Sequence, residues 1–309
     1  MILVLRALGV GDLATAVPAL RALRSAYPGE ELALAAPAWL GPLVDLVGGV
    51  DRLVPTGGLG PPPWPGPPPQ VAVNLHGRGP QSHRMLAGAG RLLAFRCPAA
   101  GHRTGPPWRA DEHEVDRWCR LLDWYGIPAD RADLALRRPP PGRTPAGVTV
   151  VHPGSKIAAK RWPADRFAAL ARHLADRGHR VVVTGSADER DLAARVAAGA
   201  GLPGAAVRAG ETDLAELAAL VAGARLVVSG DTGVGHLATA YGTPSVLLFG
   251  PVPPARWGPP ADRPRHRVLW APGTGRSHPS GAGPGLTLAA LPVDRVLAAV
   301  DEAEETVRV

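Results

Sequence analysis

The chain has 309 residues, of which 46% are hydrophobic and 20% charged, and it is long enough for two globular domains of about 150 residues each. Its formal net charge is +7, but the arginines are scattered along the chain and no nucleic-acid-binding motif accompanies them. Composition and charge therefore argue against a nucleic-acid partner and are compatible with an anionic ligand.

The cysteines and the amino-terminal residues bear on the compartment. Cys97 and Cys119 have no metal or redox spacing, as expected in a reducing environment. Met1 leads directly into a predicted strand without a signal-peptide pattern, and no apolar run approaches the ~20 residues of a membrane span. We therefore expect a cytoplasmic protein. Peripheral contact with the inner face of the membrane is compatible with this expectation.

In the first half of the chain, short apolar runs alternate with helical spacing, which is typical of a parallel α/β sheet. Strands are predicted over 2–8, 31–36, 52–54, 71–75 and 92–96, and helices over 13–26, 39–47, 111–125 and from about residue 81. The alternation stops at 137–147, where three consecutive prolines predict a semi-rigid linker between domains.

The second half repeats this alternation up to a Gly/Pro-rich stretch at 276–286. Strands are predicted over 148–151, 180–184, 226–228, 245–249 and 268–270 and at Val207, and helices over 163–177, 188–200, 213–222, 236–241 and 293–306. The fold class expected is α/β, with two Rossmann-like doubly wound parallel-sheet domains, 1–140 and 146–292, facing a central cleft.

One stretch, 226–251, predicts a strand, a tight turn, a short helix and a second strand. A glycine-rich turn that feeds a helix presents free backbone N–H groups at a positive helix end, which is a site for an anion. Thr232 is the predicted N-cap, Gly233 lets a ligand approach closely, and His236 lies one turn further on. An ordinary turn capped by Asp231 and Thr232 is the alternative that these residues leave open.

Asp12 follows the first predicted strand, within a Gly-Val-Gly-Asp-Leu-Ala segment that formally fits the dinucleotide-binding fingerprint. A carboxylate in that loop would repel a pyrophosphate, and no acidic residue ends the second strand to hold a ribose. At the carboxyl end of a strand, Asp12 is well placed as a general base. A role as the N-cap of the following helix is equally compatible with its position.

A second polar cluster, 152–163, follows the first strand of the second domain. Gly154 and Ser155 offer a backbone amide and a hydroxyl, and Lys160 offers a mobile ammonium group for a diphosphate. Solvated surface lysines are the alternative. Since Lys156 and Lys160 are the chain's two lysines and both fall in this segment, we favour phosphate binding.

Together these stretches resemble glycosyltransferase family 9, whose best-known members are the ADP-heptose lipopolysaccharide heptosyltransferases. Four places carry the resemblance, in an order and spacing that span most of the chain: 8–12 with 18–24, 153–155 with 160–163, 231–233 with 236–244, and 249–251 with 257–259.

The resemblance implies a GT-B fold, with the acceptor in the first domain, the nucleotide sugar in the second, and no metal or other cofactor. Asp12 becomes the catalytic base, and Lys160 the catalytic partner of the diphosphate. Glu189 resembles the family's ribose-binding acid. The residues implied to bind the donor are Gly154, Ser155, Lys160, Glu189, Asp231, Thr232, Gly233 and His236.

The acceptor side departs from the family pattern. Members that act on lipopolysaccharide carry an Asp-x-x-Gly segment after the fourth strand, with a nearby Lys-Ser, whereas residues 74–82 here read Asn-Leu-His-Gly-Arg-Gly-Pro-Gln-Ser. Gly11, His76 and Arg78 are the candidates to meet the acceptor, although a purely structural loop is equally compatible. A glycan, a glycolipid or a small molecule therefore stays open as the acceptor.

The leading hypothesis is an inverting, metal-independent glycosyltransferase that moves a heptose-like sugar from an ADP-linked donor to a hydroxyl group. A single carboxylate suffices, because the departing diphosphate needs no acid, unlike the leaving group of a hydrolase. The alternatives are a nucleotide-sugar epimerase or hydrolase of the same architecture, a nucleotide-binding module with a decayed site, and an NAD dehydrogenase.

The last segment, 293–309, is predicted as a terminal helix. Val293, Val296, Leu297 and Val300 form one apolar stripe along it. By likeness to GT-B enzymes, we expect this helix to cross back and pack on the first domain.

Overall fold

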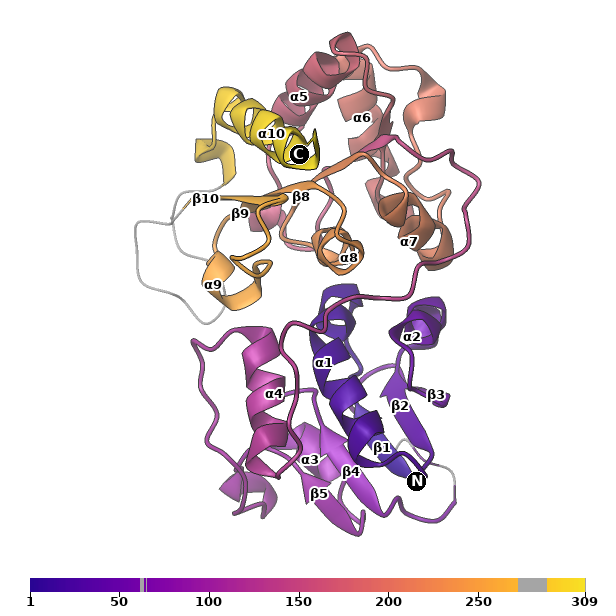
Figure 1. The fold of residues 1–309 in the computed structure, drawn as a ribbon, viewed down its shortest axis with the longest axis vertical. Helices are drawn as coiled ribbons and strands as arrows, with labels where there is room; N and C mark the ends of the chain where they lie inside the picture. Colours follow the sequence, from indigo (N-terminus) through magenta and orange to yellow (C-terminus); the bar gives the residue numbers. More distant parts are fainter. Residues whose placement is uncertain (62–63, 65, 272–287, 309) are drawn as a thin grey trace. The chain divides into compact units, whose positions relative to one another are not determined.

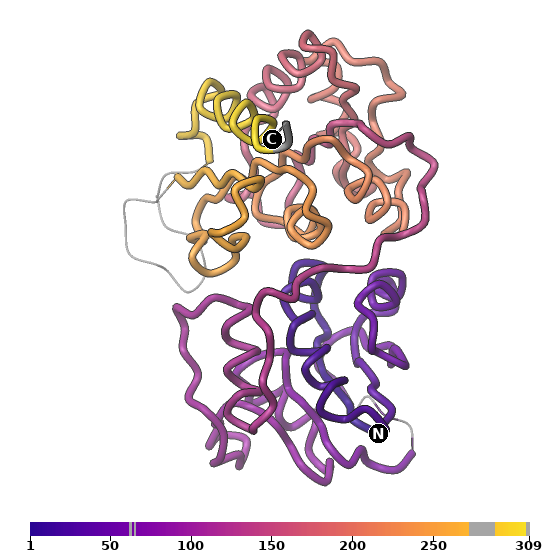
Figure 2. The backbone as a smooth tube through the Cα atoms, viewed as in Figure 1, coloured from indigo at the N-terminus to yellow at the C-terminus, as the bar shows by residue number. Residues whose placement is uncertain are grey.

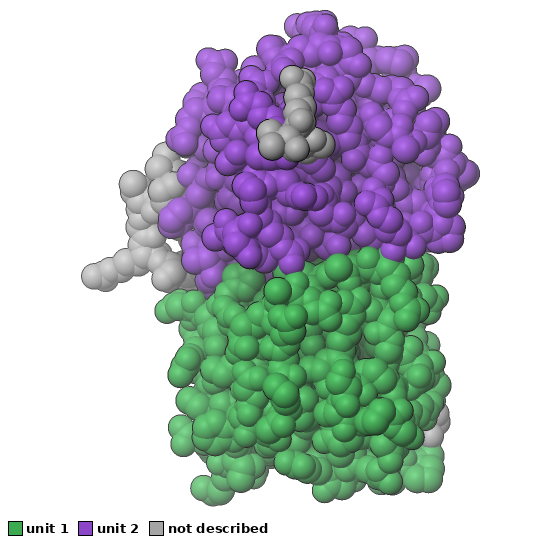
Figure 3. Space-filling view, in the orientation of Figure 1, with its two compact units in different colours: residues 1–137 green, residues 138–309 purple. Residues whose placement is uncertain are grey.

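The structure is a computed structural model that describes residues 1–61, 64, 66–271 and 288–308. The chain divides into two compact units, Met1–Arg137 and Arg138–Val309 (Figure 3). Figure 2 traces the backbone through both units, and the division falls inside the proline-rich segment. The Gly/Pro-rich stretch 276–286 lies outside the described residues. Among those residues, no helix combines the length and the apolar character needed to cross a membrane.

The described part of unit 1 contains a parallel sheet of five strands in the order β3-β2-β1-β4-β5 (Figure 1). Its strands are β1 (Ile2–Leu5), β2 (Leu32–Ala36), β3 (Arg52–Pro55), β4 (Val71–Asn74) and β5 (Arg91–Leu93). Its helices are α1 (Val10–Ala26), α2 (Gly41–Val47), α3 (Gln81–Met85) and α4 (Glu114–Trp124), with short 3₁₀ turns at Ala38–Leu40 and Pro98–Ala100.

The start of α1 differs from the prediction. The helix begins at Val10 rather than Leu13, because Gly9 is the N-cap and Asp12 occupies the third helical position, where its side chain accepts the Gly9 N–H. Asp12 is thus one half of a capping pair and not the N-cap itself. The helix continues through Pro18, whose ring it accommodates among buried side chains.

Unit 2 holds a second parallel sheet, whose five described strands are ordered β10-β9-β8-β6-β7. One isolated parallel β-bridge, between Val207 and Val183, marks the position of a further strand beside β7. Counting that bridge, the order becomes that of a Rossmann sheet. The strands are β6 (Thr149–His152), β7 (Val181–Val183), β8 (Leu226–Gly230), β9 (Ser245–Phe249) and β10 (His266–Trp270).

Helices cover both faces of the second sheet. Figure 1 shows α5, α6 and α10 grouped on one side of it and α7 with α8 on the other. These helices are α5 (Ala164–Asp176), α6 (Arg190–Ala200), α7 (Leu214–Ala222), α8 (Gly233–Tyr241) and α10 (Val293–Arg308), and the short α9 spans Pro254–Trp257. Two doubly wound parallel sheets confirm the predicted fold class.

The terminal helix α10 packs within unit 2. Val296 and Val300 are fully buried in a core that they share with Phe167 of α5 and Val196 of α6. Val293 packs against the same core. The apolar stripe of α10 is therefore used on its own sheet and its neighbouring helices, and packing of this helix on the first domain stays a prediction.

Each sheet has a point where the strand order reverses, and ligands of open α/β sheets bind beyond the carboxyl ends of the strands that meet there. In unit 1 this point lies between β1 and β4, where Leu5 is paired with Asn74. In unit 2 it lies between β6 and β8, where His152 is paired with Ser229. The polar residues singled out in the sequence follow these four strands, except Glu189, which follows β7.

Candidate functional site

In unit 1, Asp12 lies just beyond the carboxyl end of β1. Its Oδ2 accepts a hydrogen bond from the Gly9 N–H at 3.1 Å, and its Oδ1 lies 3.5 Å from Nη2 of Arg6. The Asp12 side chain is 27% exposed, whereas that of Arg6 is fully buried. The carboxylate is thus fixed in orientation while one side remains open, and this is the arrangement that a proton acceptor requires.

The loop after β4 approaches the same place. The buried Asn74 accepts the His76 N–H at 3.0 Å, and His76 Nδ1 in turn accepts the Ala7 N–H at 3.2 Å. The neutral ring therefore carries its proton on Nε2. Burial and the charge of Arg6 lower the pKa of His76, against a smaller raising effect of Asp12. His76 is accordingly uncharged at neutral pH.

The remaining acceptor-side candidates differ in setting. Gly11 lies in the first turn of α1, next to Asp12, whereas Arg78 is an exposed loop residue. Asn74 opens the segment 74–82 that departs from the expected family pattern, and its Nδ2 donates to the Gly77 carbonyl at 3.3 Å. At this position the side chain organises the loop.

In unit 2, the structure brings together two residues that lie 71 positions apart. Lys160 ends a short 3₁₀ turn (Ala158–Lys160) after β6, and its Nζ donates to Oδ2 of Asp231, which follows β8, at 2.6 Å. Their side chains are 17% and 5% exposed. Gly230 permits the approach, since a Cβ there would lie 2.8 Å from the Lys160 carbonyl oxygen. The result is a partly accessible ammonium group backed by a buried carboxylate.

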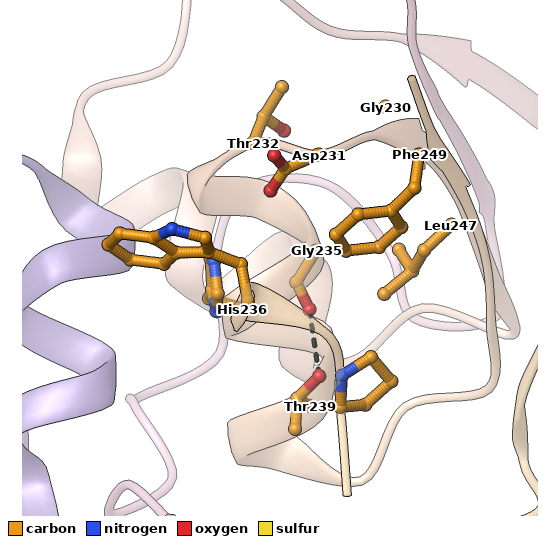
Figure 4. Close-up of a pocket in the computed structure, with 10 residues that line it drawn as sticks. Gly230, Asp231, Thr232, Gly235, His236, Thr239, Leu247 and Phe249 are labelled. Carbon is orange, nitrogen blue, oxygen red and sulfur yellow. Dashed lines mark hydrogen bonds between the residues drawn. The ribbon is translucent and has the colours of Figure 1, made fainter. Parts of the chain in front are cut away.

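The amino-terminal end of α8 adds donors beside this pair. Thr232 is the N-cap, as predicted, but its hydroxyl makes no capping bond and has no hydrogen-bond partner among the described residues. Figure 4 shows Asp231 and Thr232 together at this end of the helix, next to Gly235. Because the first N–H groups of a helix also lack acceptors within the helix, an anion here would meet several unused donors.

A third group of donor-side residues lies after β6 and β7. A Cβ at Gly154 would overlap the carboxyl group of Glu189, so glycine is what allows this side chain to lie across the loop. Glu189 also accepts the Ser186 N–H at 2.9 Å. His152 Nδ1 lies 3.0 Å from the Thr184 hydroxyl; burial lowers the pKa of His152, which the charge of Glu189 partly opposes.

Ser155 supports the same loop from within. Its hydroxyl accepts the Ile157 N–H at 3.3 Å, and its carbonyl accepts from Nε of Arg161 at 2.7 Å. The other lysine of the loop, Lys156, is exposed.

His236 borders a small cavity beside α8. Its ring meets the edge of the Trp257 ring, with centroids 5.8 Å apart and planes inclined by 71°. Phe249 and Pro259 line the same cavity as Asp231, Thr232 and Gly235, and Figure 4 shows His236 and Phe249 on its two sides. The fourth stretch of the resemblance is thus brought to the predicted donor residues.

Sequence reasoning missed Arg6 and Glu114. Arg6 interrupts the otherwise apolar run 2–8, which is the signal that could have marked it as a buried, partnered charge. No comparable signal exists for Glu114, which lies 108 positions away and contacts Arg6 Nη2 at 3.1 Å.

Two Rossmann-like units, each with an ion pair at the reversal of its strand order, define the class: an α/β protein built from two doubly wound parallel-sheet units. The sequence pattern of glycosyltransferase family 9 (heptosyltransferase) matches residues 101–275, which is more than half of the chain. The chain belongs to this family.

Curated relatives match parts of the chain. Lipopolysaccharide heptosyltransferase 1 of Pseudomonas aeruginosa is 37% identical over 165 residues, covering 51% of this chain and 45% of that protein. Lipopolysaccharide heptosyltransferase 2 of Escherichia coli K12 is 37% identical over 106 residues, covering 33% and 30%. The chain thus spans less than half the length of these relatives in each match.

Solved structures agree with the fold over almost the whole chain. The family 9 glycosyltransferase of Veillonella parvula has a TM-score of 0.77 at 19% identity, with 99% of this chain and 97% of that one covered. The Escherichia coli ADP-heptose lipopolysaccharide heptosyltransferase II has a TM-score of 0.76 at 22% identity, with 100% and 99% covered. At sequence identities of 19% and 22%, these matches show that the fold is shared and nothing more.

Proposed function

We propose that this protein is an inverting, metal-independent glycosyltransferase that transfers a heptose-like sugar from an ADP-linked donor to a hydroxyl group of a glycan, glycolipid or small-molecule acceptor. The observation that carries the proposal is the Lys160–Asp231 pair beside the open amino-terminal end of α8. It combines a cation, unused helix N–H groups and the unpartnered Thr232 hydroxyl, which are the donors that a diphosphate needs.

The donor class is supported by the family. The curated relatives named above are heptosyltransferases, and Escherichia coli heptosyltransferases of similar fold were solved with ADP and with an ADP-2-deoxy-2-fluoro heptose. In this chain Glu189, lying across Gly154, would accept hydrogen bonds from the ribose hydroxyls. His236 and Trp257 would border the sugar end of the donor.

The proposed reaction is a single displacement. Asp12 takes the proton of the acceptor hydroxyl while that oxygen forms a bond to the anomeric carbon of the donor sugar. The bond from that carbon to the diphosphate oxygen breaks on the opposite side, which inverts the configuration. Lys160 and the N–H groups at the start of α8 stabilise the charge that develops on the departing nucleoside diphosphate. No metal is needed, because these groups already supply positive charge.

The two lysines of the loop after β6 offer a matched test. Isothermal titration calorimetry with ADP, in buffer containing EDTA, should show binding to the unmodified protein. Lys160→Ala should weaken it by about 1–3 kcal/mol, the usual size of a charge-assisted hydrogen bond. Lys156→Ala removes the same charge from the same loop at an exposed position and should change the affinity little.

Two results would contradict the proposal. One is equal losses in the two variants, which would mean that only the net charge of the loop matters. The other is binding that appears only after Mg²⁺ is added, which would reject the metal-independent donor site.

A further inference from the structure

A chain of four charged side chains runs inward from Asp12, and the proposed reaction uses only its outer end. Asp12 Oδ1 lies 3.5 Å from Arg6 Nη2, the same nitrogen lies 3.1 Å from Glu114 Oε1, and Glu114 Oε2 is paired with Arg117 Nη1. Asp12 keeps 27% of its side chain exposed, whereas the other three are exposed by 6% or less.

Arg6 is partnered on every side. Its Nε donates to the Asp12 carbonyl at 2.8 Å, its Nη1 to the Leu75 carbonyl, and its Nη2 contacts the Thr15 hydroxyl at 3.3 Å. The guanidinium also stacks on the Trp118 ring, 4.7 Å from its centroid. Because a buried guanidinium costs several kcal/mol when unpaired, these contacts are what allow a charge at the end of an apolar strand.

Glu114 divides its charge between two arginines. It accepts from Arg6, from Arg117 and from Nε1 of Trp118 at 2.9 Å. The formal charges of these four side chains, two carboxylates and two guanidiniums, sum to zero. Asp12 therefore faces a cation whose charge is partly neutralised from behind.

We infer that Arg6 is the positioning residue for the Asp12 carboxylate, and that Glu114 keeps Arg6 from making that carboxylate too weak a base. The inference rests on the proposed role of Asp12. A cation 3–4 Å from a carboxylate favours its ionised form and so reduces its affinity for a proton. Since general-base catalysis weakens as that affinity falls, a fully uncompensated Arg6 would hold Asp12 in place but impair it.

The other groups that face Asp12 do not supply the same control. His76 lies close enough to Asp12 and Arg6 for their charges to affect its pKa, but burial lowers that pKa and leaves the ring neutral at neutral pH. Thr15 and Gly9 contribute uncharged contacts. Glu114 and Arg117 are the charged residues beyond Arg6 in this series, and substituting them changes the charge near Arg6 without removing a contact to Asp12.

These two residues give variants with opposite expected signs. Glu114→Gln leaves Arg6 uncompensated, so the midpoint for Asp12 should move to lower pH than in the unmodified protein. Arg117→Met leaves Glu114 to act on Arg6 alone, so Asp12 should titrate at higher pH. Glu112→Gln is the control, since Glu112 is also a little-exposed carboxylate paired with an arginine, Arg120, two residues before Glu114.

The titration of Asp12 can be read without substrate. Protein labelled with ¹³C at the aspartate carboxyl carbons is titrated by NMR, with the Asp12 signal identified by its loss in Asp12→Asn, and melting curves confirm that each variant is folded. Opposite shifts of the midpoint in Glu114→Gln and Arg117→Met, with none in Glu112→Gln, support the inference. A purely structural role predicts no such pair of opposite signs.

Unmoved midpoints, or equal shifts in the control, overturn the inference. If one of the two test variants does not fold, the sign of the other against Glu112→Gln still decides. Failure of the proposed function is a separate result, because it would appear as normal transfer by Asp12→Asn whatever the NMR midpoints are.

Discussion

The two units place an ion pair at the same topological position but expose opposite charges. In unit 1 the cation is the buried member, with Arg6 fully buried and Asp12 27% exposed. In unit 2 the anion is the buried member, with Asp231 5% and Lys160 17% exposed. One sheet architecture thus offers a carboxylate in one unit and an ammonium group in the other, according to which partner faces inward.

Local structure explains which partner is buried. In unit 1 Arg6 directly follows β1 and its side chain is fully buried, while the carboxylate lies in the first turn of α1, near a partly positive helix end that favours an anion. In unit 2 the carboxylate directly follows β8, and the lysine reaches it from the neighbouring loop. The proposed proton acceptor and the proposed phosphate-binding cation therefore both lie where a parallel strand leads into a helix.

The largest effect should follow from breaking the unit 1 pair at its exposed member. Asp12→Asn keeps the size of the side chain and an oxygen for the Gly9 N–H, but it cannot accept a proton at neutral pH. Transfer, measured as ADP release from an ADP-sugar with acceptor, should fall by roughly 10²–10⁴-fold, the range for losing a general base. The affinity for ADP should not change.

Asp51→Asn is the matched control for this experiment. Asp51 is a half-exposed carboxylate of unit 1 that is paired with Arg24, away from the strand reversal. It should leave transfer within about twofold of normal. Near-normal transfer by Asp12→Asn would reject Asp12 as the base, and loss of transfer together with a lower melting temperature would make it a structural cap.

An intermediate effect should follow from breaking the unit 2 pair at its buried member. Asp231→Asn leaves Lys160 without its ionic partner, so the free energy of unfolding should fall by about 1–3 kcal/mol. ADP, which lacks the transferred sugar of the donor, should bind at least as tightly as before, because a negative charge has been removed beside the proposed diphosphate site. Denaturant unfolding and calorimetry measure the two quantities.

This pattern is the reverse of that expected for Lys160→Ala, in which affinity falls. If Asp231→Asn instead weakens ADP binding as much as Lys160→Ala does, then Asp231 acts chiefly by orienting the lysine. The charge of Lys160 alone would then not account for the binding of ADP.

The fold was largely predictable because its signals are local. Apolar runs of strand length and helical spacing alternate through both units, and the prolines at 139–141 mark the point near which the chain divides. The partner of the α10 stripe was not predictable in this way. An apolar face indicates that a helix packs, but the residues it packs against, such as Phe167, are fixed only by the assembled core.

The sequence predicted candidate site residues one at a time but did not predict which of them form pairs. Glycine-rich turns after strands identified Asp12, Lys160 and Asp231, yet nothing in the sequence joined Lys160 to Asp231 or Arg6 to Glu114. Such pairs depend on strand order, which sets which loops are neighbours. The apolar pattern of one strand does not by itself identify its neighbour in the sheet, and general connection rules only reduce the number of possible strand orders.

The smallest effect on ADP affinity should come from a substitution at Gly154 in unit 2. This substitution tests the proposed ribose contact separately from the proposed diphosphate contacts. Gly154→Ala would place a methyl group where the Glu189 carboxyl group lies, and the backbone there is not in the left-handed region, so displacement of Glu189 is the main expected consequence. ADP should bind about 3–10-fold more weakly, the scale of one lost hydrogen bond.

Gly204→Ala, where nothing lies within 4 Å of the new methyl group, is the control and should bind normally. With 2′,3′-dideoxy-ADP, the difference between Gly154→Ala and the unmodified protein should disappear. A difference that persists with this analogue would mean that the loop acts on the diphosphate, and that Glu189 does not hold the ribose.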